Sequence, residues 1–309
     1  MGSPLRLSLA PGELPDDVAA MIAEVAWTIV RATFEVAEAA MSRFQEGSEL
    51  TSLNRRSPES APISRPLERA LSAAHRAHRV TGGRFDPRIL DALERIGYPG
   101  VPQGHTATRR PSAGGERILE RDGRTGRVAL GRPVDLGGIG KGLALRWAAN
   151  ALDASIVGTS GPPMSYLLDA GGDIVVSGSP GAGGPWNVAI EDPRGGPEPV
   201  AVAAIAGRGA IATSSVRRLR WDHDGRTVHH LIDPRSGQPG GAGMLAVTVA
   251  GADPAWAEVW SKALFLEGAQ GIAGMARARG LAAWWIPAGG ALEMTAAARV
   301  RTVWVASEA

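Results

Sequence analysis

Apolar residues recur at three- and four-residue steps in several stretches of the chain, which is the spacing of an amphipathic helix. The first stretch begins at Asp16 and ends near Phe44. Asp253 and Pro254 predict the start of a later helix, because aspartate caps free amides of a first turn and proline fits the first helical position. The helices predicted in this way cover residues 16–44, 65–80, 254–266 and a segment that ends at Gly280.

Short apolar runs separated by glycine and proline predict strands, and they dominate the second half of the chain. Asp122 and Gly123 lie between two such runs and indicate a hairpin turn. The predicted strands are 118–119, 128–130, 166–168, 174–176, 188–190, 200–205, 245–249, 281–286 and 300–305. No fixed-period repeat or clear linker divides the sequence. We therefore expect one domain over residues 1–309, formed as a single unit or as two intertwined subdomains.

The composition is that of an ordinary globular protein, with 44% hydrophobic and 21% charged residues among 309. The formal net charge of +2 creates no strong positive field, so nucleic-acid binding is not implied. The absence of cysteine excludes disulfides, thiolate metal sites and a lipid-attached amino-terminal cysteine. No apolar run predicts a membrane span, and the first residues lack the pattern of an export signal. We expect a cytoplasmic protein, with an export signal already removed as the open alternative.

A glycine-rich segment, residues 135–142, follows a predicted strand and precedes a segment that can form a helix. Glycines let the backbone approach a ligand and helix amino-terminal amides attract anions, so a pyrophosphate would suit this turn, with Lys141 adding positive charge. The P-loop pattern fails, because Asp135 stands at its first glycine and Gly142 at its Ser/Thr. The dinucleotide fingerprint fails at Leu143. Taken alone, the segment can also be a simple chain reversal.

Short blocks of sequence surround this turn in a fixed order. They are 41–54 (MSRF, SEL and LN), 83–87 (GRFDP), 134–142 (VDLGGIGKG), 169–174 (DAGGDI), 186–193 (WNVAIEDP), 212–215 (ATSS) and 230–237 (HLIDPRSG). Together they resemble the signature of the FAD:protein FMN transferase family, the ApbE-type flavin transferases. Any one block is weakly specific, but chance rarely delivers all of them in order.

The resemblance implies a protein that binds FAD, uses magnesium at its pyrophosphate, and moves the FMN half to a threonine or serine of a target flavoprotein with release of AMP. Some members of the family instead hydrolyse FAD to FMN and AMP. In either reaction a hydroxyl attacks one phosphorus while cations neutralise the charge that grows on the oxygens. The implied fold is α+β, with largely antiparallel sheets flanked by helices.

The resemblance also implies roles for single residues. Asp86 would accept hydrogen bonds from adenine, Met41 would line the flavin side, and His230 would take the proton of the attacking hydroxyl because imidazole titrates near neutral pH. Without the family, Asp86 would be a turn residue, Met41 a core residue and His230 a structural histidine. The catalytic candidates are His230, Lys141 and Lys262. The cofactor-binding candidates are Met41, Asp86, Gly137, Gly138, Gly140, Lys141, Gly171, Gly172, Asp173, Thr213, Ser214 and His230.

The sequence departs from the family on the helix near its carboxyl end. Where the family carries Asp and, four residues later, Thr to hold magnesium, this chain has Glu258 and Lys262. Positions four apart share a helical face, so these two side chains can form an ion pair. Magnesium requires an octahedron of oxygen ligands and an ammonium supplies none, so Lys262 would partly stand in for the cation. The candidate metal ligands that remain are Gly140, Glu258 and Ser261, and a solvated helix face is the alternative interpretation of the pair.

Two further departures bear on function. Arg88 stands where the family commonly has Thr, and 215–218 reads Ser-Val-Arg-Arg where Gly and an aromatic residue usually follow. Three functions therefore compete: an active FMN transferase, a flavin-binding homologue with lost or repurposed catalysis, and a P-loop hydrolase. Lys262 favours the second, and the broken P-loop pattern argues against the third.

Overall fold

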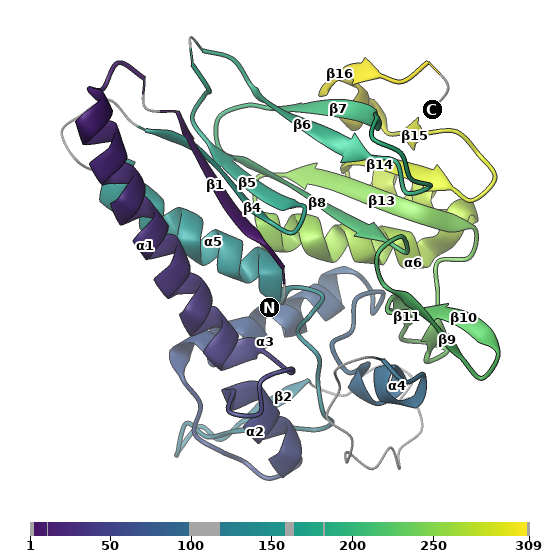
Figure 1. Ribbon diagram of the computed structural model, residues 1–309. Helices are drawn as coiled ribbons and strands as arrows, with labels where there is room; N and C mark the ends of the chain where they lie inside the picture. Colours follow the sequence, from purple (N-terminus) through teal and green to yellow (C-terminus); the bar gives the residue numbers. More distant parts are fainter. Residues whose placement is uncertain (1–2, 11, 99–117, 158–163, 182, 308–309) are drawn as a thin grey trace.

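A seven-stranded sheet forms the centre of the protein in this computed structural model, which describes residues 3–10, 12–98, 118–157, 164–181 and 183–307 (Figure 1). Each strand pairs with its neighbours in antiparallel register. In spatial order the strands are β1 (Leu5–Ala10), β4 (Ser165–Ala170), β5 (Asp173–Ser177), β8 (Gly209–Ser215), β13 (Met244–Gly251), β14 (Ala282–Pro287) and β15 (Glu293–Met294).

A second, three-stranded sheet packs against one face of the first. It contains β16 (Thr302–Val305), β7 (Pro199–Ile205) and β6 (Trp186–Glu191), also antiparallel. Strand β14 lies between two apolar layers: Trp284 packs toward the three-stranded sheet and Trp285 toward a helix on the other face. Successive side chains of a strand point to opposite faces, so an uninterrupted apolar run is the pattern of a strand buried on both sides.

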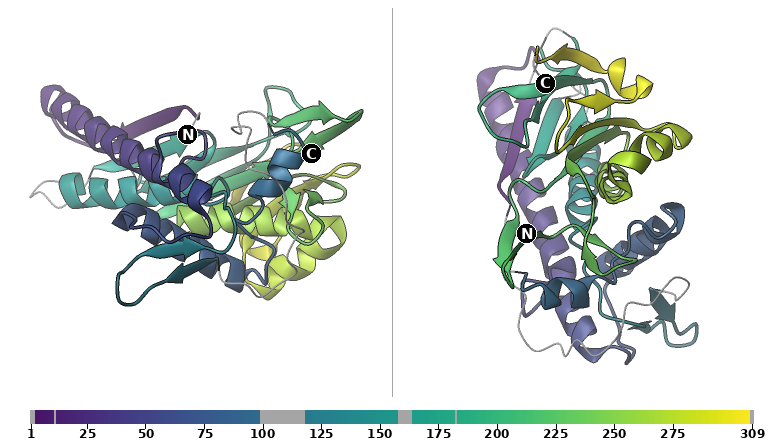
Figure 2. Two further views of the ribbon diagram at one scale, coloured as in Figure 1. Left: turned by 90° about the horizontal axis from the view of Figure 1, so that it is seen from below. Right: turned by 90° about the vertical axis from the view of Figure 1, so that its right-hand side faces the viewer.

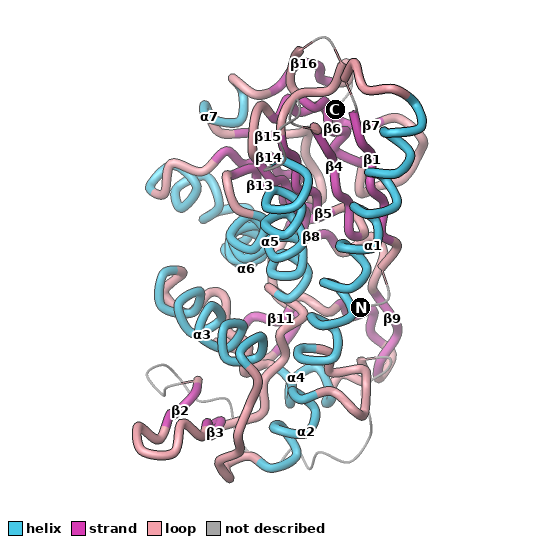
Figure 3. Tube along the Cα trace, turned by 90° about the vertical axis from the view of Figure 1, so that its left-hand side faces the viewer, coloured by secondary structure: helices cyan, strands magenta, loops and turns pink. Residues whose placement is uncertain are grey.

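Helices cover the opposite face of the seven-stranded sheet. Figure 3 shows α5 (Gly140–Leu152) and α6 (Pro254–Ala278) together on that face, and α1 (Asp16–Met41) packs on α5. Helix α6 is interrupted at Gly268, whose φ of 71° takes the chain out of helical geometry. Helices α2 (Glu49–Arg56), α3 (Arg65–Val80) and α4 (Leu90–Arg95) lie at the end of the molecule away from the three-stranded sheet (Figure 2, right).

The remaining described elements are small and lie at the edges. They are the hairpins β2 (Leu119–Arg121) with β3 (Val128–Leu130), β9 (Arg220–His223) with β10 (Arg226–His229) and β11 (Ile232–Asp233) with β12 (Gln238–Pro239), a π-helical turn at Asp153–Val157, and α7 (Ala296–Arg299). Among the described residues, no helix is both long enough and apolar enough to span a bilayer.

The predicted fold class, α+β with antiparallel sheets flanked by helices, is confirmed. Two details differ from the sequence prediction. Helix α1 ends at Met41 rather than Phe44, because Ser42 turns to extended geometry. Helix α5 begins at Gly140 instead of Leu143. The two helices predicted after Asp253 are both present within α6, where Gly268 separates them.

Candidate functional site

A cavity of about 750 Å³ opens where the ends of several elements meet. Its walls come from the end of α1, the turn after α3, the glycine-rich turn before α5, the β4–β5 turn, strand β8, the segment before β11, and α6. Most of the predicted site residues line it: Met41, Asp86, Gly137, Gly138, Gly140, Lys141, Gly171, Gly172, Thr213, Ser214, His230 and Lys262. Asp173, Glu258 and Ser261 lie directly behind this wall and are almost fully buried.

The glycine-rich turn leads into the amino terminus of α5, as the sequence predicted. Asp135 fixes the turn, because its Oδ1 accepts the amide of Gly137 at 2.7 Å. Gly142 lies in the first turn of α5 against the start of α6: a Cβ added there would stand 2.5 Å from the Cα of Ala255. The amide of Gly142 donates to Oε2 of Glu258 at 2.9 Å. A carboxylate from α6 thus satisfies one of the free amides that any helix start leaves over.

Two lysines and two carboxylates meet beside this turn. Lys141 pairs with Asp173, and its Nζ lies 3.4 Å from Oε1 of Glu258. Nζ of Lys262 lies 3.5 Å from the same oxygen, so the predicted ion pair on α6 is confirmed. Burial opposes charge on Lys141, but Asp173 and Glu258 outweigh it and raise the pKa of its ammonium. Burial likewise opposes charge on Glu258, and the two lysines outweigh it and lower the pKa of its carboxyl. Burial raises the pKa of the Asp173 carboxyl, and the charge of Lys141 offsets part of that rise.

These residues do not fit a magnesium site. The described part of the chain contains no group of three or more His, Cys, Asp or Glu side chains placed to hold a metal ion. Glu258 already accepts a backbone amide and faces two ammonium groups. Ser261, a candidate ligand, donates to the carbonyl of Glu258 at 2.9 Å and shares a hydrogen bond of 2.8 Å with Ser214. Two ammoniums repel a dication, and magnesium requires oxygen ligands that are free to form an octahedron.

His230 lines the cavity on the side of the β9–β10 hairpin. Burial and, secondarily, the charge of Lys262 lower the pKa of its imidazole to about 3. Its Nδ1 lies 3.4 Å from the carbonyl oxygen of Leu219, a contact that assigns the proton to Nδ1 and leaves Nε2 as an acceptor. The ring is therefore neutral at physiological pH, but it is a weaker base than the near-neutral imidazole expected from the sequence.

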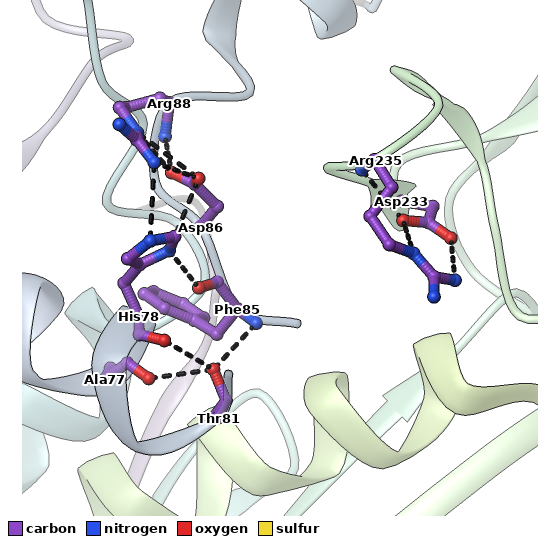
Figure 4. A network of polar contacts seen from close by, with 8 residues as sticks. All are labelled: Ala77, His78, Thr81, Phe85, Asp86, Arg88, Asp233 and Arg235. Atoms are coloured by element: carbon purple, nitrogen blue, oxygen red, sulfur yellow. Dashed lines mark hydrogen bonds and ion pairs between the residues drawn. The ribbon is translucent and has the colours of Figure 1, made fainter. Parts of the chain in front are cut away.

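The carboxylate of Asp86 is paired with Arg88, two residues along the chain. This contact was not predicted from the sequence. Arg88 donates hydrogen bonds to both carboxylate oxygens of Asp86, with Nε 2.9 Å from Oδ1 and Nη2 2.7 Å from Oδ2 (Figure 4). His78 adds a contact of 3.3 Å from its Nδ1 to Oδ2. Asp233 and Arg235, in the last of the sequence blocks, form a similar pair at 2.7 Å. Arg88 is buried and does not line the cavity, so it orients Asp86 rather than contacting a ligand.

Arg43, stacked between two aromatic rings on the cavity wall, was not predicted as a site residue. The guanidinium of Arg43 stands 4.2 Å from the ring centre of Phe44 and 4.3 Å from that of Tyr98, and its Nε lies 3.2 Å from Oδ2 of Asp135. Arg43 was part of a recognised block, but nothing in the sequence placed Tyr98 beside it. Arg217, a departure from the family pattern, also lines the cavity and donates to the carbonyl of Asp192 at 3.0 Å.

Comparison with known proteins identifies relatives of this chain. The model of the ApbE family matches residues 1–285. A protein of Klebsiella pneumoniae named FAD:protein FMN transferase is 27% identical over 73% of this chain and 66% of its own length, so the match spans about two thirds of that relative. The ApbE protein of Thermotoga maritima superposes with a TM-score of 0.80 at 24% identity, over 97% of this chain and 96% of that one. The flavinyl transferase ApbE of Pseudomonas stutzeri superposes with a TM-score of 0.75 at 24% identity, over 97% of each chain. The two superpositions show that the fold is shared.

Proposed function

Because the chain belongs to the ApbE family, we propose that it binds FAD in the cavity and transfers the FMN half to a threonine or serine of a target flavoprotein, releasing AMP. The observation that carries this proposal is the convergence of the recognised blocks on one cavity. Its volume of about 750 Å³ lies within the range of roughly 300–1,000 Å³ that is usual for cofactor sites.

The nucleotide is proposed to lie across the glycine-rich turn. The amides of 137–140 and the ammonium of Lys141 face the pyrophosphate, because a helix start and a cation both attract anions. Asp86, oriented by Arg88, faces the adenine, and Met41 lines the flavin side. In this arrangement the ligand contacts the cavity wall from α1 to α6. The β4–β5 turn, with Gly171 and Gly172, lies beside the ligand.

The reaction itself requires one proton acceptor. The hydroxyl oxygen of the target attacks the phosphorus of the FMN half, the bridging P–O bond breaks, and AMP leaves with the bridging oxygen. His230 receives the hydroxyl proton at Nε2, the nitrogen that its contact with Leu219 leaves open. A bound pyrophosphate raises the pKa of this imidazole, because a nearby negative charge favours the protonated ring.

A metal ion has no assigned step in this proposal, since Glu258, Lys262 and Ser261 do not fit magnesium. Magnesium, when bound in such a reaction, would neutralise charge on phosphate oxygens. The same cluster favours a second function, a flavin-nucleotide-binding protein that has lost or redirected its catalysis.

One experiment separates these functions. The protein is titrated with FAD by calorimetry, and the mixture, incubated with and without a candidate acceptor flavoprotein, is then analysed for FMN, AMP and protein-bound flavin by chromatography. Binding with release of AMP that a His230→Asn variant lacks supports the enzyme. Binding without AMP, with and without magnesium, supports the flavin-binding protein, and no binding refutes both.

A further inference from the structure

Lys141 and Lys262 are the only two lysines in the sequence, and every other residue of the Lys and Arg count is an arginine. They belong to different helices, α5 and α6, yet both approach a single carboxylate oxygen, Oε1 of Glu258, at 3.4 and 3.5 Å. A lysine ammonium is a compact point charge, whereas a guanidinium is a planar fork that covers a wider area. The chain therefore places its two compact cations at one point of the cavity wall.

The ammonium of Lys262 has N–H groups available to donate to a ligand. An ammonium has three donors, and among the described residues the one ion-pair partner of Lys262 is Glu258. Its side chain lines the cavity and is 19% exposed. Its stem crosses the glycine-rich turn: a Cβ added to Gly138 would stand 3.1 Å from its Cδ. The ammonium is thus held beside the turn where the proposed pyrophosphate lies.

The charges of this cluster disfavour binding of a divalent cation. The formal charges of Lys141 and Lys262 balance those of Asp173 and Glu258. A divalent ion would have to displace an ammonium from a carboxylate while facing positive charge from the other lysine. Binding of an anionic ligand is favoured instead, because the anion accepts hydrogen bonds from ammonium groups that are already held in place.

We propose that Lys141 and Lys262 hold the pyrophosphate of the nucleotide in the place of a divalent cation, so that this chain binds FAD without metal. The inference rests on the proposed binding of FAD and specifies how that site neutralises its ligand. A single ammonium carries half the charge of a dication, and the amides of the glycine-rich turn supply further positive potential.

The first test is FAD affinity measured by calorimetry in EDTA and in magnesium chloride. We expect the two dissociation constants to agree within about twofold. Lys262→Met should weaken binding about tenfold to a hundredfold in EDTA, which is the range for loss of a hydrogen bond to a charged group. The matched control is Arg277→Met, which removes one positive charge from an exposed position of the same helix and should leave affinity unchanged.

A second measurement needs no variant. Because the chain has two lysines, selective ¹³C-lysine labelling gives only two sets of side-chain signals in an NMR spectrum. Addition of FAD in EDTA should shift the ε-carbon signals of both lysines, and addition of magnesium chloride to the free protein should shift neither. The paired change Glu258→Asp with Lys262→Thr should reverse this behaviour, making FAD binding depend on magnesium.

The failures of the two proposals are distinguishable. FAD binding that requires magnesium, or lysine signals that FAD in EDTA leaves in place, would overturn the metal-free site while leaving FAD binding intact. Manganese bound to the free protein, seen by electron paramagnetic resonance, would overturn it as well. If the wild-type protein binds no FAD in either buffer, the proposed function fails and this inference fails with it.

Discussion

A single methyl group at Gly142 tests the packing that forms the site. In Gly142→Ala, the new Cβ would lie 2.5 Å from the Cα of Ala255 and 2.6 Å from the carbonyl oxygen of Pro254. Non-bonded carbon atoms prefer separations of about 3.5–4.0 Å, so α5 and α6 must move apart by about an ångström. Both obstructing atoms belong to the backbone of α6, so no side-chain rotation can relieve the clash.

The cost of this change has two parts. Forcing a methyl group into a packed interface costs about 1–3 kcal/mol. Separation of the helices also lengthens the bond from the amide of Gly142 to Glu258, and a buried acceptor that loses its donor costs about 1–3 kcal/mol. Alanine favours a helix over glycine by roughly 0.5–1 kcal/mol, which offsets part of the loss. We expect Gly142→Ala to lower the free energy of unfolding by about 2–4 kcal/mol.

Gly274→Ala is the matched control, because Gly274 lies in α6 with open space around its added Cβ. It should raise the free energy of unfolding by about 0.5–1 kcal/mol. Urea titration followed by tryptophan fluorescence measures both variants against the wild type. A Gly142→Ala protein as stable as the wild type would show that the close approach of α5 and α6 is not a constraint, and the account of the site would lose its basis.

Three further predictions concern charged groups. Burial raises the pKa of Glu94 to about 7, so its ionisation destabilises the fold as pH rises from about 4.5 to 7, and Glu94→Gln should be more stable than the wild type at pH 8 but not at pH 4, as urea unfolding would show. The positive charge of Lys262 lowers the pKa of His230, so Lys262→Met should raise that pKa in an NMR titration, and an unchanged value would contradict the coupling. Arg88→Met should lower the free energy of unfolding by about 1–3 kcal/mol, because the half-buried Asp86 loses its main ion-pair partner and retains the contact with His78, and adding Asp86→Asn should recover part of the loss in a double-mutant cycle.

Local pattern was sufficient to predict much of this fold. The apolar runs at 166–168 and 245–249 predicted β4 and β13, and helical spacing predicted α1 and α3. Strand β1 was missed although Leu5, Leu7 and Leu9 occupy alternate positions, which is the pattern of a half-buried strand, and it pairs with β4 more than a hundred and fifty residues later. Strand β8 was missed for another reason: its Ala-Thr-Ser-Ser sequence has weak strand preference, and its neighbours β5 and β13 fix it in the sheet.

The site residues were predicted only because short sequence blocks resemble those of a known family. The chemistry of the site depends on contacts between these blocks, which the sequence does not show. Helical spacing alone predicted the pair of Glu258 with Lys262, because both residues lie on one helix. The approach of Lys141 to the same carboxylate depends on how closely α5 packs on α6, and a glycine makes that approach possible. Gly142 was recognised from the sequence as a departure from the P-loop pattern. In the fold, its missing side chain brings two helices together, allows its amide to bind Glu258, and so places the second lysine of the chain beside the first.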